Sequence, residues 1–269
     1  MKKLIALLMT AVMLVGMLAG CTSSGSEASV GSTGTDTSFK TIEKGKLLMA
    51  TNAAFPPYEM TTDDGGFEGI DVEIAQAIAG KLGLTLVIQD MDFDAALLAV
   101  QQGKSDIVMA GVSVTDDRKL VMDFSNSYAT GVQVVIVTED SAIASVDDLF
   151  EGGYTIGVQT STTGDLYCTW DLEDEGLATV ERYNKGADAI QALLSGKIDC
   201  VVIDNEPAKA FVEANEGLVI LDTEYAVEEY AIAMSKDDEE LYELVNATLE
   251  EMIADGTVAE IVGRYISAE

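Results

Sequence analysis

The chain has 269 residues, with 47 acidic and 15 basic side chains, no histidine and a formal net charge of −32. So negative a chain is poorly suited to bind nucleic acid or to adsorb to anionic lipid by charge alone. Without histidine, a Ser-His-Asp triad and the common kinds of zinc site are excluded, and we expect no metal and no cofactor.

The first 20 residues have the pattern of a bacterial export signal. Lys2 and Lys3 give a positive start, and residues 4–18 are mostly apolar but short for a membrane span, which needs about 20 residues. The quartet Leu18-Ala19-Gly20-Cys21 resembles the lipobox of bacterial lipoproteins, which implies cleavage before Cys21 and a lipid on its thiol. We therefore expect a signal peptide at 1–20 and anchoring by this lipid only, at the extracellular face of the cell membrane (or in the periplasm). An ordinary secreted protein is the alternative.

Residues 21–40 are rich in Ser, Thr and Gly, which cannot bury enough apolar surface to fold, so they are predicted to be a flexible linker. The roughly 230 residues after it exceed one typical core. They begin with a strand at 46–51 and the stretch TNAAFPPYE (51–59). Asn52 follows the strand at its carboxyl end, and the Pro-Pro pair holds Phe55 in a rigid turn.

Strand and helix patterns then alternate. Apolar residues at helical spacing over 70–82 predict a helix that ends before Gly83, and the next elements are a strand at 84–88, a helix at 92–102 and a strand at 106–110. This alternation predicts an α/β fold with mostly parallel strands. Phe93, at the start of the second helix, forms with Phe55 a candidate slot for a ligand side chain. Core packing is the alternative for both rings.

Two segments of the chain repeat one pattern. LAVQQGKSDIVMAG (98–111) and QALLSGKIDCVVID (191–204) both read as helix, Gly-Lys, Asp and a four-residue apolar strand. Gly103 and Gly196 fit the position after a helix end, where a positive φ is favourable. Ligands of open α/β sheets gather beyond the carboxyl ends of such strands. The first repeat ends at Ala110-Gly111 and leads to Arg118, and the second ends at Asp204.

The loop AGVSVTDDRK (110–119) supplies a candidate anion site. The planar fork of Arg118 matches a carboxylate, and the backbone N–H groups near Ser113 add further donors. The alternative is a surface ion pair between Arg118 and Asp116 or Asp117, which would contribute little.

A second loop, GVQTSTTGDLY (157–167), follows a strand at 154–158 and contains the candidate site residues Gln159, Thr162 and Thr163. Its hydroxyl groups and the start of the following helix favour an anion. With the opposite charge of Asp204 nearby, these loops suit the backbone end of a free α-amino acid. Simple helix capping is the alternative for the threonines and for Asp204, which precedes a helix at 206–214.

These stretches, in unbroken order over about residues 44–266, resemble the bacterial extracellular solute-binding proteins for polar amino acids, which serve ATP-binding-cassette importers. The blocks TNAAFPPYE, GIDVEIAQAIAGKLG, AGVSVTDDRK, IGVQTSTTGD and GKIDCVVIDNEPA carry the resemblance. It implies a two-lobe periplasmic-binding-protein-like fold (type II), with two mostly parallel sheets joined by two crossing strands. It also implies a monomer that is not an enzyme. This monomer closes on a free polar L-amino acid and docks on the importer's membrane permease subunits.

The resemblance also assigns roles. Arg118 holds the α-carboxylate with help from Ser113 and the Thr163 backbone, and Asp204 with the carbonyl of Ala110 or Gly111 takes the α-ammonium. The ligand lies between Phe55 and Phe93, and Asn52 reads its side chain.

We place lobe 1 at 41–130 and 231–269, lobe 2 at 131–230, and the crossing strands near 128–132 and 228–232. Two positions depart from the family pattern. Ser161 stands where the family loop usually has glycine, and it would be strained if the backbone there needs a positive φ. Asn52 stands where several relatives carry aspartate, which weakens the case for a cationic ligand side chain without excluding arginine or lysine.

Two other kinds of function stay open at this stage. A dehydratase-like enzyme would need an acid free in the cleft to protonate a leaving group, for which Asp165 or Glu59 could serve. A sensory protein would use the same lobes to dock on a separate receptor. A disulfide between Cys168 and Cys200 is also left open.

The lipobox gives a direct test. Replacing Cys21→Ser removes the thiol that would carry the lipid, so the precursor should stay uncleaved or the protein should leave the membrane fraction. Fractionation of cells and the size of the product measure this. A variant that is processed and partitions like the parent would show that the lipobox interpretation is wrong.

Overall fold

The computed structural model describes residues 39–267. The predicted signal peptide, Cys21 and residues 21–38 of the predicted linker lie outside this range. Within it, no helix combines the length and the apolar composition that a membrane span requires.

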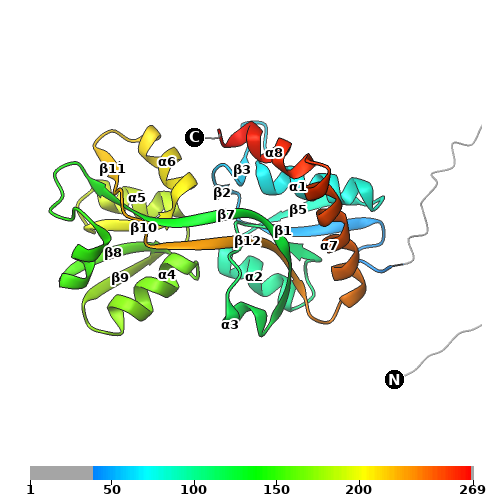
Figure 1. Cartoon of the computed structure of the whole chain (residues 1–269), viewed down its shortest axis with the longest axis horizontal. Helices are drawn as coiled ribbons and strands as arrows, with labels where there is room; N and C mark the ends of the chain where they lie inside the picture. Colours follow the sequence, from blue (N-terminus) through cyan, green and yellow to red (C-terminus); the bar gives the residue numbers. More distant parts are fainter. Residues whose placement is uncertain (1–38, 268–269) are drawn as a thin grey trace, which may run out of the picture. The chain divides into compact units, whose positions relative to one another are not determined.

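Two groups of parallel strands form the framework (Figure 1). In the first group the strand order is β5-β1-β6, and in the second it is β10-β8-β9. Their bounds are β1 (Lys46–Thr51), β5 (Thr85–Asp90), β6 (Ile107–Val108), β8 (Tyr154–Gln159), β9 (Ala178–Tyr183) and β10 (Cys200–Asp204). In both groups the carboxyl ends of the strands carry the loops that the sequence singled out.

Two long antiparallel strands, β7 (Met122–Thr138) and β12 (Ala226–Ser235), run between the two groups. β12 pairs with β6 of the first group and β7 pairs with β10 of the second, so the hydrogen bonding is continuous from β5 to β9. The predicted architecture of two mostly parallel sheets joined by crossing strands is confirmed. The predicted positions are also confirmed, because Gly131 and Glu228 are direct partners across the two strands.

The remaining strands are short. β11 (Leu218–Ile220) pairs with β7, while β2 (Ala54–Phe55), β3 (Glu59–Thr61) and β4 (Phe67–Glu68) form a small separate sheet. The helices are α1 (Ile70–Lys81), α2 (Phe93–Gln101), α3 (Asp116–Lys119), α4 (Thr163–Cys168), α5 (Gly186–Leu194), α6 (Asn205–Ala214), α7 (Glu239–Ala254) and α8 (Thr257–Tyr265). A 3₁₀ helix, η1 (Val146–Glu151), precedes β8, and a π-helical turn, η2 (Thr169–Glu173), extends α4.

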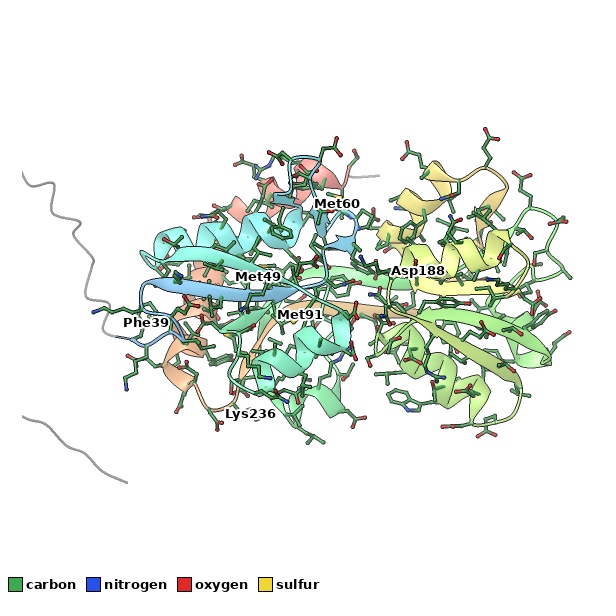
Figure 2. The ribbon with its side chains drawn as sticks, turned by 180° about the vertical axis from the view of Figure 1, so that it is seen from behind. Phe39, Met49, Met60, Met91, Asp188 and Lys236 are labelled. Carbon is green, nitrogen blue, oxygen red and sulfur yellow. The ribbon has the colours of Figure 1, made fainter. Side chains whose placement is uncertain are left out.

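Buried apolar side chains form four clusters, two in each half, and we call each pair of clusters a core. The first core draws its buried residues from 47–128 and 230–261, and the second core draws them from 134–218. Seen from behind (Figure 2), Met49 on β1 lies in the half built around the first core, and Asp188 on α5 lies in the other half. Phe55 packs against both cores, so it lies where the two halves meet.

The repeated helix-Gly-strand pattern folds as predicted at both positions. Gly103 (φ 64°) and Gly196 (φ 68°) follow the ends of α2 and α5 in the left-handed conformation. β10 is buried over all five residues, but β6 covers two residues rather than the five predicted at 106–110. At one end the Asp106 carboxylate, rather than a strand backbone, accepts the N–H groups of Ile42 and Leu48. At the other end the chain turns at Gly111, where φ is 54°.

Cys168 and Cys200 are buried in the second core as free thiols. Burial raises the pKa of Cys200 to about 12, and it raises the pKa of Cys168 as well. The disulfide that the sequence left open is therefore not formed in this structure.

Ser161 has a φ of 63° and is the one non-glycine residue with a positive φ among residues 39–267. The strain expected from the departure at this position is therefore present. The N–H group of Ser161 donates to the Asp165 carboxylate at 2.8 Å, and Asp165 is itself paired with Arg182 at 2.8 Å. A charged network behind the loop thus holds a serine in a conformation that favours glycine.

Replacing Ser161→Gly should therefore stabilise the fold. A non-glycine residue in the left-handed region costs on the order of 1 kcal/mol, and the larger unfolded-state entropy of glycine offsets part of this gain. We expect the free energy of unfolding to rise by about 0.5 kcal/mol, measured by urea titration. Ser161→Ala is the matched control, because it keeps the strain. A glycine variant no more stable than the alanine variant would contradict this account.

Candidate functional site

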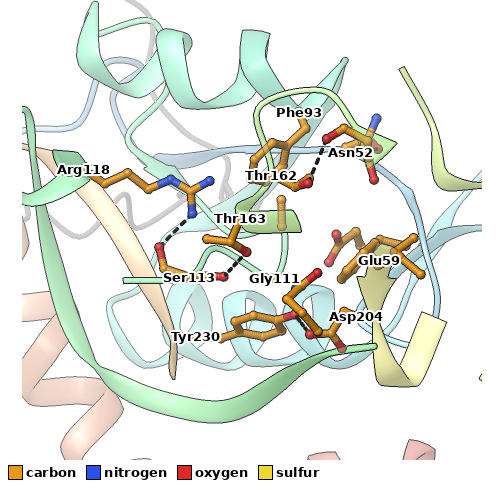
Figure 3. Close-up of a pocket in the computed structure, with 15 residues that line it drawn as sticks. Asn52, Glu59, Phe93, Gly111, Ser113, Arg118, Thr162, Thr163, Asp204 and Tyr230 are labelled. Atoms are coloured by element: carbon orange, nitrogen blue, oxygen red, sulfur yellow. Dashed lines mark hydrogen bonds between the residues drawn. The ribbon is translucent and has the colours of Figure 1, made fainter. Parts of the chain in front are cut away.

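The carboxyl ends of the parallel strands surround one cavity. β1 and β6 of the first group and β8 and β10 of the second lead into its walls, and the crossing strands β7 and β12 contribute Gln133 and Tyr230. Figure 3 shows Tyr230 beside Asp204 in this cavity. The space between the atoms, counted together with the open solvent at its mouth, is about 400 Å³. The residues that line it are Asn52, Phe55, Glu59, Phe93, Ala110, Gly111, Ser113, Arg118, Gln133, Gln159, Thr162, Thr163, Ile203, Asp204 and Tyr230.

All eleven ligand-binding candidates from the sequence line this cavity. Four further residues do as well: Glu59, Gln133, Ile203 and Tyr230. Glu59 was considered only as a candidate acid of a dehydratase, although it directly follows the turn that contains Phe55 and the Pro-Pro pair. Gln133 and Tyr230 lie on or beside the predicted crossing segments, and that position was the one available signal for them. Which side chains of a crossing strand face a cavity depends on its twist, and the sequence does not reveal the twist.

Arg118 is buried in the cavity wall, with 7% of its surface exposed. It belongs to the short helix α3, which the Thr115 side chain caps by accepting the backbone N–H of Arg118. Its guanidinium donates to the carbonyl of Ser113 at 2.8 Å and to the carbonyl of Ser161 at 2.9 Å, so it touches both halves of the molecule. The ring of Phe93 lies beneath the guanidinium carbon, 5.5 Å from ring centre to carbon.

No carboxylate pairs directly with Arg118 in the described part of the chain. Asp116 pairs instead with Lys119 at 3.6 Å, so the surface ion pair considered for Arg118 is not formed. Burial lowers the pKa of Arg118 to about 10, and the negative charge of Glu228 opposes this shift. The side chain therefore stays charged at neutral pH. A buried cation with only carbonyl partners favours the entry of an anion.

Glu228 on β12 joins both halves behind the arginine. One carboxylate oxygen accepts from the Ser113 hydroxyl at 3.0 Å, from the Thr163 hydroxyl at 2.8 Å and from the side-chain amide of Gln133 at 3.1 Å. Its other oxygen is buried without a hydrogen-bond partner. The Ser113 and Thr163 hydroxyls are also 3.3 Å apart, so the first loop, the second loop and both crossing strands meet at this carboxylate.

Asp204 lies at the end of β10, where it takes the capping role considered for it and also lines the cavity. It caps α6 by accepting the Glu206 N–H at 3.3 Å, and it accepts a hydrogen bond from the Tyr230 hydroxyl. Burial raises the pKa of Asp204 to about 7, although both hydrogen bonds act to lower it. Gly131 makes room for this pair, because a Cβ there would lie 2.5 Å from the Asp204 carboxylate.

Thr162 likewise caps its helix, by accepting the Asp165 N–H at 3.4 Å, and it still lines the cavity.

Asn52 and Gln159 bridge the two halves on the side of the cavity nearer α2. The Gln159 amide donates to Asn52 at 3.0 Å, and the Asn52 amide donates to the carbonyl of Met91 at 2.8 Å.

Glu59, from the start of β3, is wholly buried and lines the cavity. Asp71 on α1 lies behind it, also wholly buried, and accepts the Gly111 N–H at 3.0 Å. Burial raises the pKa of Glu59 well above its ordinary value and raises that of Asp71 to about 6. The two acids therefore form a second polar region of the site, away from Arg118.

A comparison with known proteins places the chain in a family. Residues 47–268 match the model of the bacterial extracellular solute-binding proteins, family 3. The arginine-binding extracellular protein ArtP of Bacillus subtilis (strain 168) is 32% identical over 273 residues and covers all of both chains. A probable histidine-binding protein of Neisseria gonorrhoeae is 32% identical over 243 residues, which cover 89% of this chain and 90% of its own length.

Solved structures agree with this assignment. A crystal structure of the arginine-binding protein of T. maritima, in a mutant form, is 35% identical with a TM-score of 0.76, and the alignment covers 83% of this chain and 96% of that one. Both the sequence match and the shared fold extend over the two halves and the crossing strands. The chain therefore belongs to the bacterial extracellular solute-binding proteins of family 3.

Proposed function

We propose that this protein binds a free polar L-amino acid in the cavity between its two halves and delivers it to an ATP-binding-cassette importer. The observation that carries the proposal is Arg118, a buried cation that touches both halves and has no carboxylate partner among residues 39–267. The α-carboxylate of an amino acid would provide the missing anion, because its two oxygens match the guanidinium fork. Relatives named as arginine- and histidine-binding proteins support the same ligand class.

The remaining walls suit the rest of an amino acid. Asp204 is a buried acid with a raised pKa, and an α-ammonium group would favour its charged form. Phe55 and Phe93 supply apolar faces for the ligand's side chain, while Asn52 and Gln159 offer amides to its end. Each predicted contact therefore has a residue of the right chemistry in the cavity wall.

Hinge closure is the proposed mechanism of capture. We take the first core as lobe 1 (41–130 and 231–269) and the second core as lobe 2 (131–230), with β7 and β12 as the hinge. The hydrogen bonds from Arg118 to Ser161 and from Gln159 to Asn52 join the two lobes and would break on opening. A ligand that contacts both lobes favours the closed form by its extra affinity for that form.

The proposal also covers the oligomeric state, the location and the partner of the protein. We infer a monomer that is anchored by lipid on Cys21 outside the cell membrane and hands its ligand to the importer's permease subunits. The dehydratase alternative loses one of its two candidate acids, because Asp165 is paired with Arg182 at 2.8 Å. Recovery of the ligand unchanged after incubation would separate a binding protein from such an enzyme. A thermal-shift screen against free amino acids identifies the ligand, since binding to the native state raises its stability.

Replacing Arg118→Lys keeps the charge but loses the fork, so the affinity for the amino acid should fall at least tenfold, about 1.4 kcal/mol or more. Calorimetry with the amino acid and with its α-carboxamide measures the contact. The variant should discriminate less against the amide than the parent does. Arg264→Lys is the matched control, because Arg264 is an exposed arginine paired with Glu73 and Glu260. Equal losses for acid and amide would show that Arg118 does not hold the carboxylate.

Replacing Asp204→Asn should weaken binding by about 2–5 kcal/mol, since the ligand's ammonium would lose its partner. In the parent, affinity should fall as the pH drops below about 7, because the ligand needs the ionised form of Asp204. The free protein should behave in the opposite way. The pKa of Asp204 is higher in the folded protein than in the unfolded chain, so the unliganded fold is stabilised by protonated Asp204. This stability is lost as the pH rises through about 7.

At pH 8 the unliganded Asp204→Asn variant should therefore melt no lower than the parent. Calorimetry from pH 5.5 to 8.5 and thermal melts without ligand measure the two effects. Undiminished affinity in the variant would leave Asp204 with its capping role alone.

A further inference from the structure

The cavity contains more buried negative charge than Arg118 and a zwitterion can balance. Arg118 is the one basic side chain among the residues that line it, whereas Glu59 and Asp204 line it as acids. Asp71 lies directly behind Glu59, and Glu228 lies behind Arg118. An amino acid with a neutral side chain brings no cation that could pair with Glu59 and Asp71.

Glu59 is where the excess is least satisfied. The side chain is wholly buried, and no N–H or hydroxyl group donates to either of its carboxyl oxygens. Asp71 is the neighbouring acid, because its backbone N–H donates at 2.9 Å to the carbonyl of Tyr58, the residue before Glu59. Burial first, and then Asp71, raise the pKa of Glu59. One oxygen of Asp71 accepts the Gly111 N–H, and its other oxygen is buried without a hydrogen-bond partner. Neighbouring buried carboxyl groups with so few donors are stable when they share one proton.

In the described part of the chain, no basic side chain acts on the pair. The titratable groups that act on it are Asp90 at the end of β5, Tyr58 between β2 and β3, and Tyr128 on β7, which lies beside Asp71. Asp204 and Tyr230 line the same cavity from β10 and β12. All of these groups are acids or phenols. The pKa shifts of Glu59 and Asp71 agree with a shared proton, because burial raises both pKa values and so favours the protonated form.

Resting on the proposed function, we infer that the ligand is an amino acid with a cationic side chain, whose guanidinium or ammonium group takes the place of the proton shared by Glu59 and Asp71. The proton leaves Glu59 for the solvent, and the ligand's positive charge replaces it beside the carboxylate. The charge of this part of the site is then unchanged by binding. Within residues 39–267 no group of three or more candidate ligands is placed to hold a metal ion, which favours an organic cation.

Binding of such a ligand must therefore release a proton that binding of a neutral analogue does not. L-Arginine and L-citrulline form a matched pair, because they differ in the charge of the terminal group and little in size. L-Lysine tests whether an ammonium serves as well. Calorimetry of the full chain at pH 7.5, in phosphate and in Tris, counts released protons from the difference in observed heats.

We expect L-arginine or L-lysine to bind at least tenfold more tightly than L-citrulline and to release about one more proton. Glu59→Gln keeps the size of the side chain and a donor toward Asp71. It should lower the affinity for the cationic ligand at least tenfold, change that for L-citrulline less than threefold and abolish the extra proton. Glu73→Gln, at a half-buried acid of α1 that pairs with Arg264 outside the cavity, is the control and should change neither affinity nor proton count.

Equal affinities or equal proton counts for the cationic ligands and L-citrulline would overturn the inference. These measurements on the parent protein decide the matter even if Glu59→Gln does not fold. If a neutral amino acid binds best and depends on Arg118, the inference fails while the proposed function stands. If no free amino acid binds, the proposed function itself fails.

Discussion

The structure depends on one buried cation whose direct partners are neutral. Arg118 donates to the carbonyl of Ser113 in one half and of Ser161 in the other, and no carboxylate among the described residues contacts it. Taking a guanidinium out of water is costly unless hydrogen bonds and charges replace the water. The carbonyls replace the hydrogen bonds, and Glu228 supplies a negative charge at a distance. An anion bound to the guanidinium would supply the direct negative partner that Arg118 lacks. The complete site around the guanidinium exists only where both halves are together.

The rest of the site contains buried acids that lack positive partners among the described residues. Glu59, Asp71 and Asp204 are wholly or almost wholly buried, and burial raises the pKa of each. Groups perturbed in this way gather at functional sites because their electrostatic cost is relieved by a ligand rather than by the fold. One pole of the cavity thus favours an anion, and the other favours positive charge. A molecule with a carboxylate at one end and positive charge beyond it satisfies both, which is the physical content of the proposed ligand class.

Several site residues could be predicted because they obey local rules. Arg118 and Asp204 follow apolar strands, and ligands gather beyond the carboxyl ends of parallel strands. Gly103 and Gly196 indicated helix ends through their conformational freedom, and both have the positive φ expected of them. Ser161 was singled out because it departs from a glycine pattern, and its φ of 63° agrees. The inferences on Arg118, Asp204 and the two glycines needed only the neighbouring residues in the sequence, and the one on Ser161 needed the family pattern as well.

Other features depend on contacts between distant parts of the chain. Asp71 and Gly111 are 40 positions apart, and Ser113 and Glu228 are 115 apart, yet each pair is hydrogen-bonded in the site. No local pattern distinguishes Glu59 from a surface acid. Its burial results from the packing of α1 and of the turn that contains Phe55 and the Pro-Pro pair against it. Tyr230 faces the cavity from a strand whose pairing with β7 shifts register just after it. Such a shift changes which side chains face inward, and sequence alternation alone cannot locate it.

The sequence by itself determined the alternation of strands and helices and the loops that carry Arg118, Thr163 and Asp204. These follow from composition, hydrophobic period and backbone preference, which are properties of short stretches, whereas the two crossing segments were implied by the family resemblance. The tertiary structure decided that Arg118 has no carboxylate partner among residues 39–267, that Glu228 joins both halves and that Glu59 is buried beside Asp71 without a donor. Burial and pairing belong to the assembled chain, because the dielectric surroundings of a charge depend on every segment packed around it.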